Sequence, residues 1–196
     1  MMHTTAVAEQ KEQKEYKRIV ITHGDIDGVI SAAVLCINYD IPVNVIFTQP
    51  FLINRVNIPE DVEEIYVSDI AVNNRDPNMT IEFINKYKDK IVVWYDHHMG
   101  GEVLNQYLDD RAVVDTSMPS CPALMKMAGL IVPEHWIEVA NSADRPVEYK
   151  TELKEYELFN NALKAVINIE ELSDKREYIM RTIVEYLVKE YRGENN

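Results

Sequence analysis

The chain has 196 residues, of which 46% are hydrophobic and 27% charged, and its formal net charge is −13 at pH 7. This composition excludes a disordered chain, and the length suits one ordinary domain or one domain with added helices. The acidic excess disfavours binding along long duplex nucleic acid, which requires clustered lysine and arginine. A small anionic substrate stays open, because bound divalent cations can reverse the charge of a site locally.

Cysteine content and hydropathy indicate a reduced, cytoplasmic setting without membrane insertion. Cys36 and Cys121 are too few for a disulfide framework. No apolar run reaches the length of a membrane span, and the N-terminus has no apolar signal core. Residues 1–16 are polar and mixed in charge, and we expect them to form a mobile or helical leader.

Short β-branched runs alternate with segments of helical spacing through the first half of the chain. The expected strands are residues 18–23, 43–49, 63–70, 90–97 and 111–117. The expected helices between them are residues 28–39 and 79–89, and Pro119 and Pro122 suit the opening turn of another. This alternation predicts an α/β fold with a mainly parallel sheet of about five strands and helices on both faces.

From Pro133 onward the β-rich runs stop, and the sequence has helical spacing. The expected helices are residues 133–144, 151–167 and 173–192. We find no repeat, no low-complexity tract and no Gly/Ser linker. Residues 17–196 are therefore predicted to form a single domain, whose C-terminal helices (about 147–196) pack against the α/β part.

Acidic and histidine side chains follow three of the predicted strands. In open parallel sheets, ligands bind beyond the carboxyl ends of the strands. The side chains at these ends are His23, Asp25, Asp27, Asp69, Asp96, His97 and His98, and the helical segment "NSADRP" adds Asp144. The sequence therefore predicts that they gather at one edge of the sheet.

The types of these side chains indicate a metal site. Carboxylates and imidazoles together are the ligands of Mn²⁺, Zn²⁺ and related ions. The set is large for a single ion and suits two ions about 3.5–4 Å apart, with one carboxylate between them. Without cations, so many aspartates at one place would raise one another's pKa values. Two such ions lower the pKa of a bridging water and hold phosphoryl oxygens during an in-line displacement.

Each residue taken alone has a simpler interpretation. Asp25 suits a helix cap, and "GDIDG" suits a turn. An isolated histidine at a strand end is more often a structural hydrogen-bonding residue than a ligand. Asp144 and Arg145 suit a plain ion pair, and Asp69 alone is uninformative. Taken together, their positions where the α/β alternation predicts a site favour the metal interpretation.

The segments "THGDIDGVISAA", "VSDI", "YDHH" and "NSADRP" resemble, in order and spacing, the four motifs of the DHH phosphoesterase superfamily. Its members include RecJ-type exonucleases, nano-RNases, cyclic-dinucleotide phosphodiesterases, family II inorganic pyrophosphatases and exopolyphosphatases. The resemblance covers about residues 17–146. It implies a five-stranded, mainly parallel sheet and a two-metal site that prefers Mn²⁺, for which Mg²⁺ or Co²⁺ could substitute.

The resemblance also implies a role for each matching residue. His23 and Asp25 would bind the first metal, and Asp69 would bridge. Asp27, His97 and Asp144 would bind the second. As catalytic residues, Asp96 resembles an outer carboxylate that orients an imidazole, and His98 resembles the residue that contacts the substrate phosphate. Gly28 permits the tight turn, and the helix N-terminus near Val29 to Ser31 could add backbone donors for an anion. Arg145 is a further candidate for substrate binding.

One departure from the family concerns the substrate. Typical members carry a second domain, DHHA1 or DHHA2, which grips the substrate with a glycine-rich motif and basic residues. Here only about 50 residues follow Arg145, too few for an independent α/β domain. Substrate-binding groups must then come from the C-terminal helices, a second subunit or a separate protein. The candidate phosphate contacts are Arg145, Arg111, Arg75 and Lys126.

The leading hypothesis is a Mn²⁺-dependent phosphohydrolase that uses a two-metal-activated water on a small phosphate compound or a short oligonucleotide. The alternative is a low-activity or inactive binding or assembly module that needs a partner chain, as the missing second domain suggests. The full ligand set argues against it, because a chain without catalysis has no need of clustered carboxylates. A hydride-transfer enzyme is disfavoured, because "HGDIDG" is acidic where a pyrophosphate-binding loop is rich in glycine. The sequence leaves open a homo-oligomer.

Overall fold

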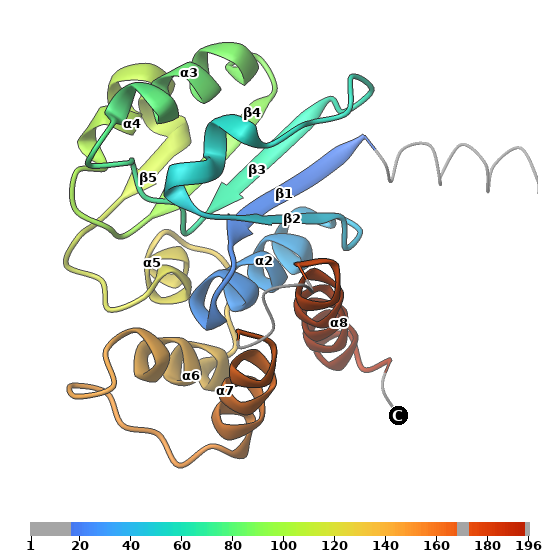
Figure 1. Cartoon of the computed structure of the whole chain (residues 1–196). Helices are drawn as coiled ribbons and strands as arrows, with labels where there is room; N and C mark the ends of the chain where they lie inside the picture. Colours follow the sequence, from blue (N-terminus) through green and yellow to red (C-terminus); the bar gives the residue numbers. More distant parts are fainter. Residues whose placement is uncertain (1–16, 168–172, 195–196) are drawn as a thin grey trace, which may run out of the picture.

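In the computed structural model, which describes residues 17–167 and 173–194, one parallel five-stranded sheet forms the centre of the molecule (Figure 1). Its strands are β1 (Arg18–His23), β2 (Val45–Thr48), β3 (Glu64–Ser68), β4 (Ile91–Asp96) and β5 (Ala112–Val114). They lie in the order β2-β1-β3-β4-β5, and every neighbouring pair is parallel. The α/β prediction is confirmed. Residues 1–16, the expected leader, lie outside the described residues.

Helices cover both faces of the sheet, as predicted (Figure 1). One face carries α2 (Ile26–Tyr39), α5 (Cys121–Met127), α6 (Glu134–Asp144), α7 (Lys154–Ile167) and α8 (Ser173–Tyr191). The other face carries the 3₁₀ helix η1 (Pro50–Arg55), α3 (Pro77–Tyr87) and α4 (Glu102–Leu108), and η2 (Asp109–Arg111) precedes β5.

The strands send alternate side chains to these two layers. In β1, Val20 packs in the cluster below the sheet, while Ile19 and Ile21 pack in the cluster above it. This alternation follows from the two-residue period of a strand. Both faces of β1 are covered, which explains why "RIVIT" is a nearly continuous apolar run.

Helix α2 is the central helix of the lower layer. It begins at Ile26 because the Asp25 side chain accepts a hydrogen bond from the Gly28 backbone N–H and caps the first turn. It is buried on most of its surface, since the sheet lies on one side and the C-terminal helices on the other. Apolar side chains of α8, including Met180 and Val184, share its hydrophobic cluster.

The parallel strands gather the candidate site residues at one end of the molecule. Because all five strands are parallel, their carboxyl ends meet at a single edge of the sheet. The loops after β1, β3 and β4 leave this edge, and α6 ends near it with Asp144. Over the described part of the chain, no helix has both the length and the apolar character that a membrane crossing requires.

Candidate metal centre

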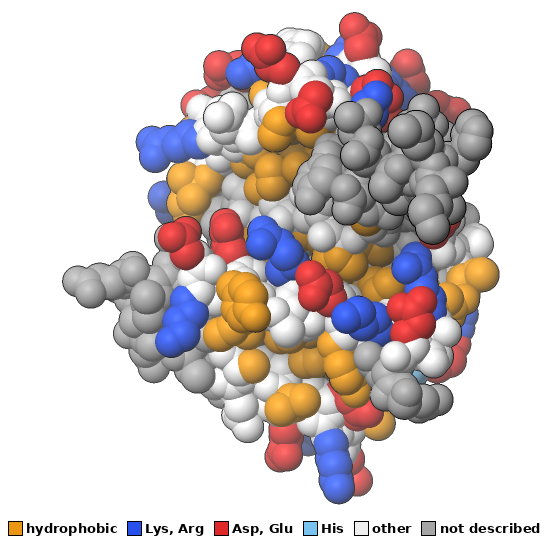
Figure 2. All heavy atoms as spheres, turned by 90° about the vertical axis from the view of Figure 1, so that its right-hand side faces the viewer, with side chains coloured by type: hydrophobic (Ala, Val, Ile, Leu, Met, Phe, Trp, Pro, Cys, Tyr) orange, Lys and Arg blue, Asp and Glu red, His pale blue; other side chains and the backbone are white. Residues whose placement is uncertain are grey.

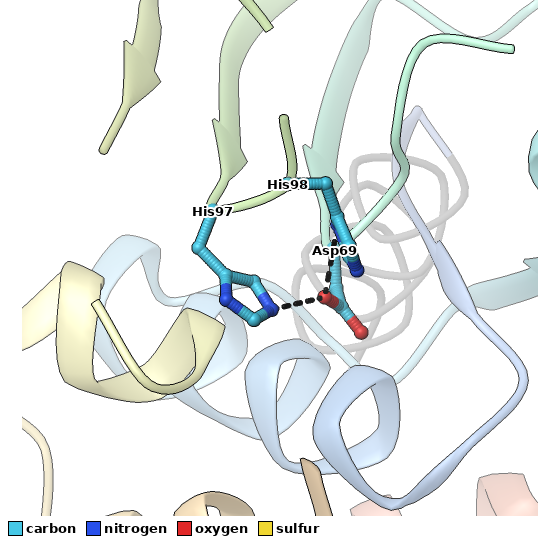
Figure 3. A group of neighbouring side chains, drawn as sticks. All are labelled: Asp69, His97 and His98. Carbon is cyan, nitrogen blue, oxygen red and sulfur yellow. Dashed lines mark ion pairs between the residues drawn. The ribbon is translucent and has the colours of Figure 1, made fainter. Parts of the chain in front are cut away.

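Seven of the predicted side chains converge at the carboxyl edge of the sheet. Their potential metal-binding atoms form three sets, and within each set all the atoms lie within 4.8 Å of one another. These sets are His23 with Asp25 and Asp69, Asp27 with His97 and Asp144, and Asp69 with His97 and His98. Figure 3 shows the third set, in which the two histidines after β4 point toward the carboxylate that follows β3.

His97 stands at the centre of three carboxylates. Its Nε2 lies 3.1 Å from Asp27 Oδ2 and 3.4 Å from both Asp69 Oδ1 and Asp144 Oδ2. Its Nδ1 donates to the backbone carbonyl of Met118 at 3.2 Å, since a carbonyl can only accept. This bond fixes the ring and directs Nε2 toward the carboxylates, although Nε2 has no hydrogen-bond partner among the described residues.

His23 is oriented in a similar way on the other side of the cluster. Its Nε2 donates to Gln49 Oε1 at 2.6 Å, and Gln49 directly follows β2. Its Nδ1 therefore faces Asp25 Oδ2 at 2.9 Å and Asp69 Oδ2 at 3.9 Å. Asp25 divides its two oxygens, because Oδ1 caps α2 through Gly28 at 2.8 Å while Oδ2 faces the cluster. The capping interpretation of Asp25 is confirmed and is compatible with a place in the cluster.

Asp27 is held from the first turn of α2 by buried donors. The backbone N–H of Cys121, at the start of α5, lies 3.1 Å from Oδ1 and 3.3 Å from Oδ2. The Ser31 hydroxyl donates to the Asp27 carbonyl at 2.7 Å and lies 3.4 Å from Oδ1. Ser31 is 0% exposed, so it offers no surface to a substrate. The Ser31 hydroxyl thus supports Asp27, while a substrate contact of the backbone near Ser31 stays a prediction.

Asp69 has the least favourable surroundings of the acidic residues. Its side chain is 1% exposed, and neither carboxylate oxygen has a hydrogen-bond partner in the described part of the chain. Its φ is +57°, in the left-handed region that residues other than glycine rarely adopt. Unpaired buried acceptors and backbone strain are both costly, and they persist together where a function requires them.

Asp96 and His98 form a tight pair beside the cluster. Asp96 is fully buried, and its Oδ1 lies 2.6 Å from His98 Nδ1, while the His98 backbone N–H lies 3.3 Å from Oδ2. Because a carboxylate fixes one ring nitrogen, the orientation of His98 is set. The His98 side chain is 38% exposed, so the ring borders solvent as well as the cluster.

The protonation of the cluster without cations follows from burial and charge. Burial, together with the charges of Asp27 and Asp25, raises the pKa of Asp69 well above its usual value. Burial raises the pKa of Asp27 to about 6, and contact with His97 only partly offsets it. Burial lowers the pKa of His97, but its contacts with Asp27 and Asp69 outweigh this effect and raise the pKa to about 11. At pH 7 the His97 ring thus carries a positive charge, which partly neutralises the carboxylates around it.

Gly28 gives the cluster its compact turn. A Cβ on this residue would lie 1.9 Å from the backbone oxygen of His23, which no side chain can accommodate. The absence of a side chain lets the start of α2 press against the end of β1, so that residues 23, 25 and 27 all face the same edge.

The predicted phosphate contacts do not share one location. Arg145 Nη2 lies 3.4 Å from the Met118 carbonyl that also holds His97, and its Nη1 lies 3.7 Å from Glu148. Arg75 is exposed in the loop between β3 and α3. Two other candidates are corrected. Arg111 binds the Lys88 and Ile91 carbonyls at the opposite edge of the sheet, where β4 begins, and Lys126 pairs with Glu134.

Three further groups at the site were not predicted from the sequence. Gln49 holds His23, and the signal that could have found it is its position at the carboxyl end of β2. The Met118 carbonyl that holds His97 is a backbone group and has no signature in the sequence. Arg176 of α8 donates through Nη2 to the Gly24 carbonyl at 2.8 Å, across 152 residues of sequence.

No protein-family model matches the chain, and no curated protein matches it. Among solved structures, it is similar to PggH from Vibrio cholerae, described as a pGpG-specific phosphodiesterase. The TM-score is 0.56 and the sequence identity is 14%, over 87% of this chain and 52% of that one. The chain thus spans about half the length of that enzyme. At this identity the similarity shows a common fold, and the function must be argued from the site.

Proposed function

We propose that this chain is a phosphoesterase of the DHH type, which uses two Mn²⁺ ions to hydrolyse a phosphodiester in a small phosphate compound or a short oligonucleotide. The observation that carries the proposal is the position and the unsatisfied burial of the Asp69 carboxylate. Its two buried oxygens lack hydrogen bonds, and they lie between one group of histidine and aspartate ligands around His23 and another around His97. Cations are the simplest partners for such oxygens.

The donor set fits two divalent ions. His23 and Asp25 would hold one ion, and Asp27, His97 and Asp144 would hold the other, with Asp69 between them. Mixed imidazole and carboxylate donors suit Mn²⁺, and Mg²⁺ or Co²⁺ could substitute. Such a pair of ions supplies a water of lowered pKa and neutralises charge on phosphoryl oxygens.

The protein's own groups orient the site for this chemistry. Gln49 and the Met118 carbonyl each hold one nitrogen of a histidine ring, so that the other nitrogen faces carboxylates. Asp96 positions His98, whose partly exposed ring would contact a phosphoryl oxygen of the substrate. The burial of Asp27 and Asp69 keeps bulk water from screening the charges of the cluster.

Several observations support a short substrate. The similar solved structure is described as a pGpG-specific phosphodiesterase, and pGpG is a short substrate. On the face of the molecule that includes α8, basic side chains are interspersed with acidic ones (Figure 2). A long polyanion needs a stripe of positive charge, which this pattern does not provide on that face. We also propose that residues 17–196 work as one domain, since α6, α7 and α8 share the hydrophobic cluster of α2.

The test uses purified protein, Mn²⁺ and a generic phosphodiester such as bis-p-nitrophenyl phosphate, with metal content measured on the same sample. We expect about two ions per chain and Mn²⁺-dependent hydrolysis. Asp69→Asn should abolish the hydrolysis while the variant stays folded by circular dichroism. Two ions without hydrolysis of any phosphate compound in a screen would instead favour the binding or assembly module. Full activity of Asp69→Asn would contradict the proposal.

A further inference from the structure

Helix α8 reaches the turn that carries two of the candidate ligands. Arg176, in its first turns, donates from Nη2 to the Gly24 carbonyl at 2.8 Å, and Gly24 lies between His23 and Asp25. One turn further on, Met180 also contacts this position. Its Cε and Sδ lie 3.7 and 3.8 Å from where a Gly24 Cβ would be. The C-terminal part of the chain thus lies at the rim of the cluster and supplies a cation there.

The positive charge of Arg176 is only partly satisfied. A guanidinium has five N–H donors, and among the described residues Arg176 makes one hydrogen bond, to a backbone carbonyl. No carboxylate of residues 17–167 and 173–194 lies within ion-pair distance of it, and its buried Nε has no hydrogen-bond partner there. Arg145, the other arginine at the cluster, is already near Glu148. A partly buried cation without a counter-charge is unfavourable, and an anion would relieve it.

We infer that Arg176 binds a phosphate group of the substrate, and so supplies a cationic contact from α8. The inference rests on the proposed phosphoesterase function. A guanidinium offers a planar fork that matches two phosphoryl oxygens, and the Gly24 hydrogen bond holds this fork beside the candidate ligands. The substrate phosphate would then lie between the cations of the cluster and α8.

A purely structural role for Arg176, as a link between α8 and the turn, makes different predictions. A link would act through His23 and Asp25, so its loss would weaken metal binding or stability. A phosphate contact would act on the anion alone. Arg181 provides a matched control, because it lies on the same helix and donates to the Val45 carbonyl at 3.5 Å, where β2 begins at the opposite edge of the sheet.

The experiment compares the wild-type chain with Arg176→Met, Arg176→Lys and Arg181→Met. Calorimetry measures the affinity for inorganic phosphate, with and without Mn²⁺, and the affinity for Mn²⁺, while Tm reports on folding. A hydrogen bond to a charged group contributes about 1.5–3 kcal/mol, so Arg176→Met should weaken phosphate binding by about tenfold or more. Arg176→Lys should lose less, because it keeps the charge but not the fork. Mn²⁺ affinity should stay within about twofold, and Arg181→Met should bind phosphate as the wild type does.

The inference is overturned if phosphate affinity is unchanged in Arg176→Met, if Mn²⁺ affinity falls in parallel, or if the wild type binds no phosphate under either condition. The fate of the proposed function is separate, because phosphate binding does not require turnover. A wild type that binds phosphate through Arg176 but hydrolyses no ester refutes the function and keeps the inference. Mn²⁺-dependent hydrolysis with unchanged phosphate affinity in Arg176→Met supports the proposed function and refutes the inference about Arg176.

Discussion

Replacing Asp69 by asparagine should separate the stability of the metal-free protein from its ability to bind metal. The side chain is 1% exposed, and both carboxylate oxygens lack hydrogen bonds within the described residues. An unsatisfied buried acceptor costs about 1–3 kcal/mol, and more when it is charged. Asparagine has nearly the same shape and tolerates the left-handed backbone that Asp69 adopts at φ +57°. Its amide can also donate to neighbouring carboxylates.

We therefore expect metal-free Asp69→Asn to be more stable than the metal-free wild type by about 1–3 kcal/mol. For a domain of this size, each kcal/mol raises Tm by about 2–4 °C. Saturating Mn²⁺ should reverse the order. Ligand at 100 times its Kd stabilises the folded state by about 2.7 kcal/mol, and the variant should gain little of this.

Differential scanning calorimetry with EDTA and with Mn²⁺ measures both effects, and Asp76→Asn, at an exposed position before α3, is the matched control. A metal-free Asp69→Asn protein less stable than the wild type would refute the claim that Asp69 is held at a cost. Equal stabilisation of both proteins by Mn²⁺ would refute its place in the metal site.

Three further predictions concern protons and packing. Mn²⁺ binding at pH 7 should release protons, because the pKa of His97 is raised to about 11 and the ring must lose a proton to bind metal. Calorimetry in buffers of different ionisation heat measures this release, and a binding heat that does not depend on the buffer would contradict the prediction. Because the pKa of Asp27 is raised to about 6, its protonated form stabilises the metal-free protein by about 3 kcal/mol. This stabilisation is fully present below the ordinary pKa of 3.8 and is lost as the pH rises through 6. Chemical unfolding at pH 4.5 and 7 should show a fall of about 2 kcal/mol, and Asp27→Asn should flatten it, whereas an equally steep fall in the variant would point to other groups. Gly28→Ala should lower stability by about 2 kcal/mol or more, since its Cβ would lie 1.9 Å from the His23 oxygen, while Gly24→Ala, whose nearest neighbours are at 3.7–3.8 Å, should be nearly neutral in thermal unfolding. Equal Tm values for the two alanine variants would contradict the packing argument.

Much of the fold and the convergence of the cluster could be predicted because both depend on local patterns. Alternating β-branched runs and helical segments require a parallel sheet, and a parallel sheet places every strand's carboxyl end at one edge. His23, Asp69 and His97 therefore had to come near one another once the strands were recognised. Arg111 follows from the same rule in reverse, because it precedes β5 and so lies at the amino edge, away from the cluster.

The remaining contacts depend on tertiary packing that leaves no local pattern. The Met118 carbonyl is a backbone group, which any residue type would provide. Arg176 reaches Gly24 only because α8 packs along α2. In the sequence, the charged residues of this segment have the spacing of an ordinary solvated helix face, so nothing distinguishes Arg176 from them. The position of Ser31 could be predicted in part. It lies four residues after Asp27, so helical periodicity places both on one face, but only packing shows that this face is buried.

The central claim is that residues from four separate segments hold two divalent cations, and anomalous diffraction from a manganese-soaked crystal tests it most directly. We predict two manganese peaks about 3.5–4 Å apart, both next to Asp69, one beside His23 and the other beside His97 and Asp144. Manganese absent from this cluster, or bound only elsewhere on the protein, would contradict the account.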